Sequence, residues 1–520
     1  MSQPITYQQT LDGLPALPSE SFQFKRGIEK EGLRVNAEAE ISQHPHYSGL
    51  GSPLTHSSIT TDYSESLLEF ITPVSRDAQS VLKYLQDVHG FANSQIGDEV
   101  IWPSSMPCII KDELDVPIAH YGSSNVGQLK HVYRHGLWHR YGRKMQCIAG
   151  VHYNFSVDDS IWQYLAQQQG VELNKDFISE GYFGLVRNFR RFSWLLFYLF
   201  GASPALDKSF VDDQEHDLKT LDDDTLYGPY ATSLRMSGLG YQNNAQDGLF
   251  VCFNSLPTYT ATLKRAMHES VPEYEAMGVK VDGQYRQLNT HLLQIENEYY
   301  SDVRPKRNSV NGEKPLTSLN EYGVEYIEVR CLDLNPFEPL GVNLEQIHFM
   351  DLFLSYCLFK PSAKLSDIEC KEVSKNQKRV VTEGRDPEFV LARKGEKVLL
   401  RDWAEELLAD MQPLAKLLDD KSGTQNYQTA LQNMRARVQN SELTPSAKVL
   451  KELVSNKQSF TQFSYQQAQN HRSLYAQAQA NINQQEWQQS VANSLQAQRD
   501  AESQDSMEFD QFLEEYSQKM

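Results

Sequence analysis

The chain has 520 residues, a formal net charge of −19 and a pI of about 5.2. This acidic balance excludes a general binder of nucleic acid or of anionic membranes, because either partner requires a dominant basic surface. Hydrophobic residues make up 40% of the chain, enough for a sizeable globular core. Length gives a prior of roughly three domains, although one catalytic body with an appended helical region fits equally well.

Cysteine usage and the apolar stretches predict a cytoplasmic protein. The six cysteines are scattered without a C-x-x-C pair, so we expect reduced and mostly buried thiols. The first twenty residues lack the basic region and the apolar run of a signal peptide. Residues 192–202 (FSWLLFYLFGA) are too few to span a bilayer and are predicted to form a buried helix.

Strand and helix patterns alternate irregularly along the first two thirds of the chain. In chain order we predict extended segments at 22–36 and 59–74, helices at 77–96 and about 128–145, a strand at 147–157, a helix at 177–201, and strands at 294–300 and 324–334. From about residue 343 onward the pattern is mainly helical. Because the segments show no regular βαβ rhythm, the sequence favours an α+β fold with an antiparallel sheet.

The last fifty residues differ in composition from the rest. Eleven glutamines fall within residues 466–498, a bias that is also typical of disorder. A sparse apolar stripe nevertheless favours long, exposed helices packed on the body. The stripe consists of Leu474, Ile482, Trp487, Val491 and Leu495.

Acidic side chains recur among apolar neighbours on several predicted strands. Strand side chains alternate between faces, so Glu29 and Glu31 point the same way. The other members of this pattern are Asp62, Glu69, His152, Glu296, Glu298 and Glu328. A lone strand glutamate is usually an exposed edge residue, but several buried together are tolerable if they bind divalent cations. Oxygen ligands without thiols suit Mg²⁺ or Mn²⁺, and these ions suit phosphates.

Basic residues follow two of these strands. The RPKR run at 304–307 comes directly after IENEYY, and Arg330 lies one strand period after Glu328. Arginine binds phosphate or carboxylate in a bidentate manner, so Arg304, Lys306 and Arg307 are candidate triphosphate contacts. Taken alone, the run is better interpreted as a solvated turn around Pro305. The chain has no phosphate loop, no G-x-G-x-x-G after a strand, no G-x-S-x-G and no H-E-x-x-H.

A histidine row and two cysteines do not match the patterns of a zinc site or a catalytic thiol. His131, His135 and His139 lie at i, i+4 and i+8, and such a row extends over about 12 Å of helix, too far for one zinc ion to contact all three. They are interpreted as a solvent-facing stripe. No signature of a catalytic cysteine surrounds Cys331 or Cys147, so both are expected to be structural.

The motifs resemble a known family in order and spacing. They are RGIEKEGLRVN, LTHSSITTDYSESLLEFITP, MPC, YGSSNVG, YRHGLWHRYG, GVHYNFS, LFGASPA, PYATSLRMSGLGY, LQIENEYY, RPKR and GVEYIEVRCLDLNPF. Together they resemble glutamate–cysteine ligase of the type 1, gamma-proteobacterial kind, from about residue 20 to about residue 360. The expected organisation is a catalytic body at 20–360 and a mainly helical region at 361–520, the whole forming either two domains or one.

The resemblance implies a carboxylate–amine ligase fold similar to the catalytic domain of glutamine synthetase, with an antiparallel sheet curved into a funnel and helices outside. It implies that ATP phosphorylates the γ-carboxylate of L-glutamate and that the amine of L-cysteine then displaces phosphate, as the first step of glutathione synthesis. About five negative charges meet in such a site, so several cations are required. A cytoplasmic, monomeric enzyme is expected.

The resemblance also assigns residues. Two or three Mg²⁺ ions, with Mn²⁺ as an alternative, would be held by Glu29, Glu31, Asp62, Glu69, His152 and Glu328. Arg330 would act with Glu328 in catalysis by stabilising the transferring phosphoryl group. Arg235 would bind glutamate. The cysteine pocket would be shaped by Tyr133, Leu137, Tyr241 and Tyr63, with Arg134 nearby. Two alternatives remain: a related ligase with another amine acceptor, and a catalytically inactive binding or regulatory member.

Overall fold

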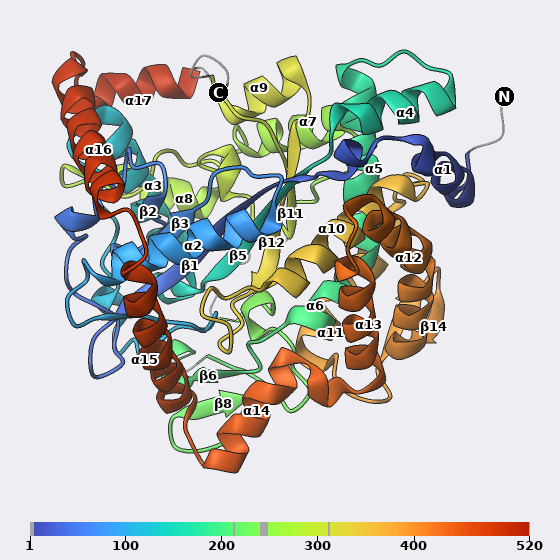
Figure 1. Cartoon of the computed structure of the whole chain (residues 1–520). Coiled ribbons are helices and arrows are strands. Elements are labelled where there is room, and N and C mark those ends of the chain that lie inside the picture. Colours follow the sequence, from blue (N-terminus) through green and yellow to red (C-terminus); the bar gives the residue numbers. More distant parts are fainter. Residues whose placement is uncertain (1–4, 212–213, 240–247, 310–312, 519–520) are drawn as a thin grey trace.

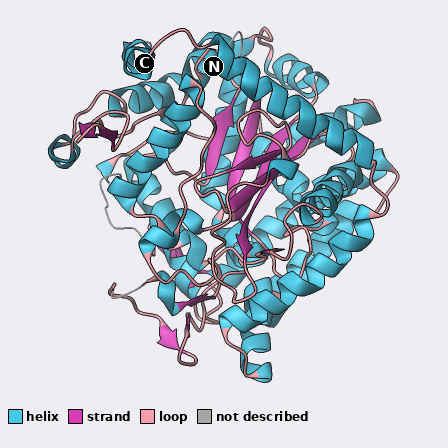
Figure 2. Ribbon diagram, turned by 90° about the vertical axis from the view of Figure 1, so that its left-hand side faces the viewer, coloured by secondary structure: helices cyan, strands magenta, loops and turns pink. Residues whose placement is uncertain are grey.

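A seven-stranded antiparallel sheet lies at the centre of the molecule, surrounded by helices (Figures 1 and 2). The structure is a computed structural model that describes residues 5–211, 214–239, 248–309 and 313–518. The sheet order is β11-β12-β5-β1-β3-β2, with β4 paired to β1. Its strands are β1 Lys25–Val35, β2 Ile59–Thr61, β3 Leu67–Ile71, β4 Val100–Ile101, β5 Gly150–Ser156, β11 Val303–Lys306 and β12 Tyr326–Asp333. The prediction of mixed helices and an antiparallel sheet is confirmed.

The helices are α1 Tyr7–Gly13, α2 Ala78–Asn93, α3 Asn125–Tyr141, α4 Asp159–Gln169, α5 Lys175–Phe192, α6 Trp194–Phe200, α7 Leu256–Ala266, α8 Pro272–Met277, α9 Pro315–Tyr322, α10 Leu344–Phe359, α11 Asp367–Glu383, α12 Leu400–Ser422, α13 Asn426–Gln439, α14 Pro445–Asn456, α15 Phe460–Gln479, α16 Gln484–Gln504 and α17 Phe509–Gln518. Small sheets contain β6 Ala205–Asp207, β7 Lys219–Thr220, β8 Thr225–Tyr227, β9 Lys280–Val281, β10 Gln284–Tyr285, β13 Val390–Arg393 and β14 Glu396–Leu399.

Two segments differ from their predicted secondary structure. The helix expected at 177–201 is divided at Ser193, whose hydroxyl oxygen accepts a hydrogen bond of 2.6 Å from Gln377 Nε2. The strand expected at 294–300 is wrong, because Glu296–Glu298 form one 3₁₀ turn and the strand begins only at Val303. The turn forms because the Glu298 carboxylate accepts the Gln294 N–H at 2.7 Å, a bond that a strand would not allow.

The two faces of the central sheet have different chemistry because strand residues alternate. On β1, Glu29 and Glu31 face one side, whereas Arg26, Ile28 and Lys30 face the other and are buried. Strand β5 alternates in the same way, as predicted, with Tyr153 toward the helices and His152 toward the acids. The mixture of acids with the buried Leu33 therefore reflects a sheet that is covered on both faces.

A buried ion pair joins the helix-covered face of the sheet to α10. Arg26 donates from Nη2 to Asp351 Oδ2 at 2.6 Å and from Nε to the same carboxylate, and Tyr153 Oη donates to Asp351 Oδ1 at 2.7 Å. The Asp351 side chain is 0% exposed and that of Arg26 is 4% exposed. Removing one partner of such a pair leaves an uncompensated charge in the core.

Asp351→Ala is therefore expected to lower the free energy of unfolding by about 3–5 kcal/mol. The measurement is urea unfolding followed by circular dichroism. Asp420→Ala is the matched control, because it breaks the exposed Lys416–Asp420 pair of 2.7 Å and should cost less than about 1 kcal/mol. Equal losses in the two variants would contradict this account of Asp351.

The C-terminal region is helical rather than disordered, and its helices pack on the body (Figure 1). Trp487 of α16 is buried and stacks on Phe91 of α2, with 5.2 Å between the ring centroids. Leu474 is 43% exposed, so the predicted apolar stripe is wrong at that position. Leu474 lies on the outer side of α15, whereas Tyr475 and His471 of that helix are buried against the body.

The cysteines and the apolar stretch 192–202 lie where the sequence predicts them. All six cysteines lie in the described part of the chain and are free thiols, four of them buried. Every side chain of α6, within the apolar stretch 192–202, is buried as predicted. Among the described residues, no helix is both long and apolar enough to cross a membrane.

Candidate active site

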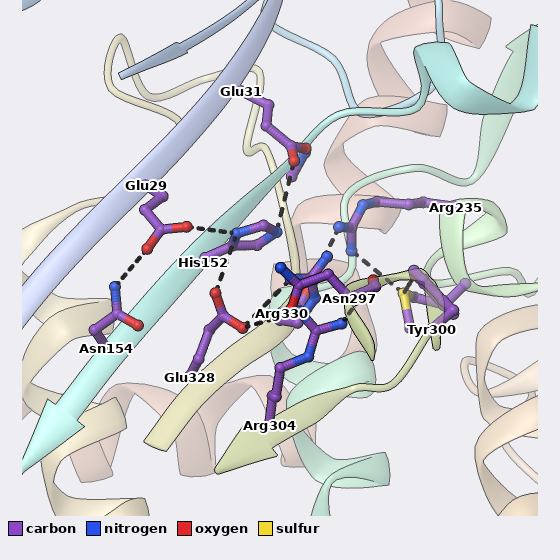
Figure 3. Close-up of polar contacts among 12 residues, drawn as sticks. Glu29, Glu31, His152, Asn154, Arg235, Asn297, Tyr300, Arg304, Glu328 and Arg330 are labelled. Atoms are coloured by element: carbon purple, nitrogen blue, oxygen red, sulfur yellow. Dashed lines mark hydrogen bonds and ion pairs between the residues drawn. The ribbon is translucent and has the colours of Figure 1, made fainter. Parts of the chain in front are cut away.

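Glu29, His152 and Glu328 converge from three neighbouring strands on one face of the sheet (Figure 3). Register places Glu29 opposite His152 across the β1–β5 pair. The Glu29 Oε2 to His152 Nδ1 distance is 3.1 Å, and the His152 Nδ1 to Glu328 Oε1 distance is 3.9 Å. One ligand atom from each residue lies within 4.8 Å of the others, which is a geometry that can hold a metal ion.

Glu31, Glu69 and Asp62 extend the acidic face toward β3 and β2. Glu31 is paired with Glu69 in the β1–β3 register, and its Oε1 lies 3.6 Å from His152 Nε2. Burial raises the pKa of Glu69 well above its ordinary value, and the charges of Glu29, Asp62 and Glu31 raise it further. Burial likewise raises the pKa of Glu31. Arg330 opposes this rise at both carboxylates without reversing it, and a divalent cation would supply further positive charge.

Basic side chains surround Glu328 on its other side (Figure 3). Arg330 Nη1, Lys306 Nζ and Arg304 Nη1 lie 3.3, 3.5 and 3.9 Å from the Glu328 carboxylate. Burial opposes ionisation of Glu328, but Arg330, Lys306 and Arg304 hold its pKa below the ordinary value. Arg307 does not join this group, because its Nε donates to the Gly323 carbonyl.

Arg235 reaches the acidic face from within η7, the 3₁₀ turn Leu234–Met236. Its Nη2 donates to the Arg330 carbonyl at 3.0 Å, and a Cβ on Gly150 would lie 2.2 Å from that nitrogen. The Nε atoms of both Arg235 and Arg330 are buried and have no hydrogen-bond partner in the part of the chain that the structure describes. Two guanidinium groups with free donors beside acids are suited to an anionic substrate.

The residues predicted for the cysteine pocket lie in three different environments. Arg134 of α3 donates from Nε to the Asp62 carbonyl at 2.5 Å, so it is close to the acidic face. Tyr133 and Leu137 of α3 are half-buried against apolar neighbours. Tyr63 is 1% exposed within the core, and its hydroxyl has no hydrogen-bond partner. Tyr241 lies outside the described residues.

Glu296 and Glu298 do not belong to the acidic face, contrary to their predicted strand positions. Arg140 Nη1 and Tyr141 Oη both donate to Glu298 Oε1, at 3.0 and 2.8 Å, in a buried network. Glu296 instead lines a cavity of about 210 Å³ beside β11. Other residues around this cavity are Arg304, Lys306, Arg307, Leu316, Leu319 and Tyr326.

The structure adds two residues that sequence reasoning did not assign. Asn154 Nδ2 donates to Glu29 Oε1 at 2.9 Å, which orients that carboxylate. Asn154 lies two residues after His152 on the same polar strand face, and this alternation could have indicated that it belongs to the site. Tyr300 donates to the Met236 sulfur at 3.0 Å next to Arg235 (Figure 3), and no strand pattern indicated this.

Carboxylates and an imidazole for a hard cation, placed next to arginine and lysine, are typical of enzymes that transfer phosphoryl groups from a nucleoside triphosphate. The model for the glutamate–cysteine ligase family matches residues 18–380. Glutamate–cysteine ligases of Alcanivorax borkumensis and Pseudomonas putida are 50% and 49% identical to the chain, over 95% and 94% of both sequences in each pair. The chain therefore belongs to the glutamate–cysteine ligase family.

Solved structures agree with this assignment. The structure of glutamate–cysteine ligase from Francisella tularensis in complex with AMP superimposes with a TM-score of 0.88 at 34% identity, covering 95% of this chain and 97% of that one. A bifunctional glutathione synthetase from Pasteurella multocida shares the fold, with a TM-score of 0.66 at 23% identity, 91% coverage of this chain and 54% of that one.

Proposed function

We propose that the protein joins the γ-carboxylate of L-glutamate to the amine of L-cysteine with hydrolysis of ATP to ADP and phosphate, the first step of glutathione synthesis. The observation that carries this proposal is the acidic face of Glu29, His152 and Glu328 with Arg330, Arg304 and Lys306 directly beside it. The names of relatives at about half identity over nearly the whole chain support the same reaction.

The residues present fit divalent cations. Oxygen donors from the carboxylates, with one imidazole and no thiol, match Mg²⁺ or Mn²⁺, and a bound cation would reduce the repulsion that Asp62 exerts on Glu31 and Glu69. We propose two or three ions held by Glu29, Glu31, Asp62, Glu69, His152 and Glu328. When bound, the ions neutralise the triphosphate and the glutamate carboxylate.

The side chains themselves perform the remaining tasks. Arg330 stabilises charge on the transferring phosphoryl group and then on the tetrahedral intermediate formed when the amine attacks γ-glutamyl phosphate. Arg235, with its unpartnered Nε, binds the glutamate moiety. Asn154 holds the Glu29 carboxylate in position. Tyr133, Leu137 and Arg134 of α3 form the cysteine side of the site in this proposal, whereas Tyr63 and Tyr241 are assigned to it by the family resemblance alone.

The cavity beside β11 is the proposed nucleotide pocket. Leu316 and Leu319 give it an apolar wall, and Arg304 and Lys306 connect it to the acidic face, as a flat base and a triphosphate require. The complex of the Francisella tularensis ligase with AMP supports a nucleotide site in this fold.

In this pocket, Lys306 and Arg307 of the RPKR run are expected to differ in their contribution to ATP binding. Lys306→Ala should raise KM for ATP by about 10-fold or more, because a charge-assisted contact worth roughly 1.5–3 kcal/mol is lost. Arg307→Ala should raise KM for ATP less, because Arg307 lines the same cavity but its guanidinium bonds to the Gly323 carbonyl. Steady-state kinetics with varied ATP test this, and a larger effect at Arg307 would reverse the assignment.

We further propose the funnel-shaped sheet of the glutamine synthetase type, a monomer and a cytoplasmic location. The convergence of Glu29, His152 and Glu328 on one sheet face supports the funnel. The contacts of 361–520 support one structural body with 20–360, since Thr461 Oγ1 donates to Asp207 Oδ2 at 2.7 Å and Ser446 N donates to the Gly201 carbonyl at 3.0 Å.

The decisive experiment follows ADP release by the purified protein with Mg²⁺, ATP and L-glutamate, before and after L-cysteine is added. We expect release that depends on cysteine. No cysteine-dependent release would overturn the proposal. Faster release with ammonia or another amine would instead assign a related ligase with a different acceptor, and no release with any amine would indicate an inactive binding member.

A further inference from the structure

Two histidines of α3 converge on each other outside the active site. His131 Nε2 and His135 Nε2 are 3.1 Å apart, although the sequence predicted a solvent-facing stripe. Both side chains are half-buried, because the ring of His120 stacks on His131 with 4.0 Å between centroids and Trp138 lies beside His135. The stripe prediction is therefore wrong for these two residues, since the loop at 119–120 packs over this turn of the helix.

The distance matches a chelate geometry. Two imidazole nitrogens bound to one zinc ion at about 2.0–2.1 Å in a tetrahedral arrangement lie roughly 3.3 Å apart. Histidines at i and i+4 on one helix face are a recurrent zinc-binding pair, as in the H-E-x-x-H motif. The objection that three histidines in line cannot reach one ion does not apply to two. His139, one turn further, stacks on Trp138 instead, at 4.3 Å between centroids.

The second ring nitrogen of His131 completes this geometry. His131 Nδ1 lies 2.8 Å from the Ala119 carbonyl, an acceptor, so Nδ1 carries the proton and Nε2 presents its lone pair toward His135. Zinc ligands are commonly oriented by such a bond from the other ring nitrogen. Without metal, His135 Nε2–H donates to His131 Nε2. With metal, the His135 proton moves to Nδ1, so two neutral imidazoles bind and no proton is released.

Both imidazoles are neutral near pH 7, so no repulsion between two imidazolium cations opposes metal binding. Burial lowers the pKa of His131, and burial together with the neighbouring His131 lowers that of His135 to about 4. A neutral imidazole selects Zn²⁺, Ni²⁺ or Cu²⁺ over Mg²⁺, which prefers oxygen ligands. The pair therefore differs in ligand chemistry from the acidic face of the sheet.

We propose that His131 and His135 form a binding site for a borderline divalent transition metal ion, with Zn²⁺ as the typical occupant and water in the remaining positions. The site lies on the helix that carries Tyr133, Arg134 and Leu137. Through the bond from His131 to Ala119, a bound ion ties α3 to the segment whose Ala119 N–H donates to the Tyr63 carbonyl at 3.0 Å.

The test is calorimetric titration of the full-length protein with ZnCl₂ in saturating MgCl₂, which occupies the oxygen-ligand sites. Wild type is expected to bind one more equivalent of Zn²⁺ than His135→Ala or His135→Gln. His139→Ala is the matched control on the same helix and should retain that equivalent. The six thiols and the acidic face are identical in all four proteins, so their Zn²⁺ binding cancels in the comparison.

Thermal unfolding gives a second measurement. Because an ion that binds only the folded state stabilises it by mass action, Zn²⁺ should raise the Tm of wild type and His139→Ala more than that of either His135 variant. Unchanged ligase rates in Mg²⁺ alone will verify that the His135 variants are folded. Equal Zn²⁺ stoichiometry in wild type and the His135 variants would overturn the proposal, as would loss of the same equivalent in His139→Ala.

Discussion

Glu328→Gln is expected to lower kcat by on the order of 10³-fold, the equivalent of about 4 kcal/mol of transition-state stabilisation. Glutamine keeps the size of the side chain but removes the negative charge that lies 3.9 Å from His152 and faces Arg330, Lys306 and Arg304. Without this charge the proposed cation site loses a ligand, so the Mg²⁺ concentration for half-maximal rate should also rise. Ligase assays across a Mg²⁺ series measure both effects.

The control for this variant comes from the residue just before the same strand. Glu325 is exposed and lies 4.0 Å from Arg307, away from the acidic face, so Glu325→Gln should keep nearly the wild-type kcat and Mg²⁺ dependence. Circular dichroism and the urea midpoint check that both variants are folded. Unchanged turnover in Glu328→Gln would remove Glu328 from the proposed metal ligands.

Arg330→Ala should lower kcat by about 10²–10³-fold, the loss typical when one group that stabilises transition-state charge is removed. Burial disfavours the charged guanidinium, but Glu328 and Glu31 raise the pKa of Arg330 above its ordinary value, so the cation persists at every working pH. Its Nε has no hydrogen-bond partner among the described residues and is available to the substrate. The effect on KM for glutamate should be smaller than the effect on kcat.

Arg330→Lys tests whether charge or geometry matters more. Lysine keeps the positive charge beside Glu328 but lacks the planar set of donors, so it should recover only part of the lost kcat. Full recovery would mean that Arg330 acts as a point charge alone. A kcat for Arg330→Ala within about twofold of wild type would exclude the proposed electrostatic role.

Much of the acidic face was predictable because strand alternation is a local property. The patterns around Glu29, Glu31, His152 and Glu328 each place an acid or histidine on one strand face, and the structure brings these faces together. The same reasoning was wrong at Glu298. Its apparent alternation with Gln294 was that of an irregular segment, in which a 3₁₀ turn buries the carboxylate against Arg140.

For the basic side chains, residue type alone did not predict which of them reach the acidic face. Lys306 and Arg307 are adjacent in RPKR, yet Lys306 lies 3.5 Å from Glu328 whereas Arg307 bonds to the Gly323 carbonyl. The direction in which each side chain points follows from the pairing of β11 with β12, which places Arg304 opposite Glu328. Strand pairing is determined by long-range contacts, and a run of basic residues in the sequence does not indicate it.

The sequence by itself determined the family resemblance, the antiparallel α+β class and which strand residues share a face, because periodicity and motif spacing are written along the chain. Only the tertiary structure decided that Glu29 lies opposite His152, that Glu31 lies opposite Glu69, and that His131 meets His135 under a loop. Strand register depends on contacts between residues that are far apart in the chain. Glu29 and His152, for example, are separated by 123 positions. Those contacts, rather than local propensity, place the charges close enough together to form a site.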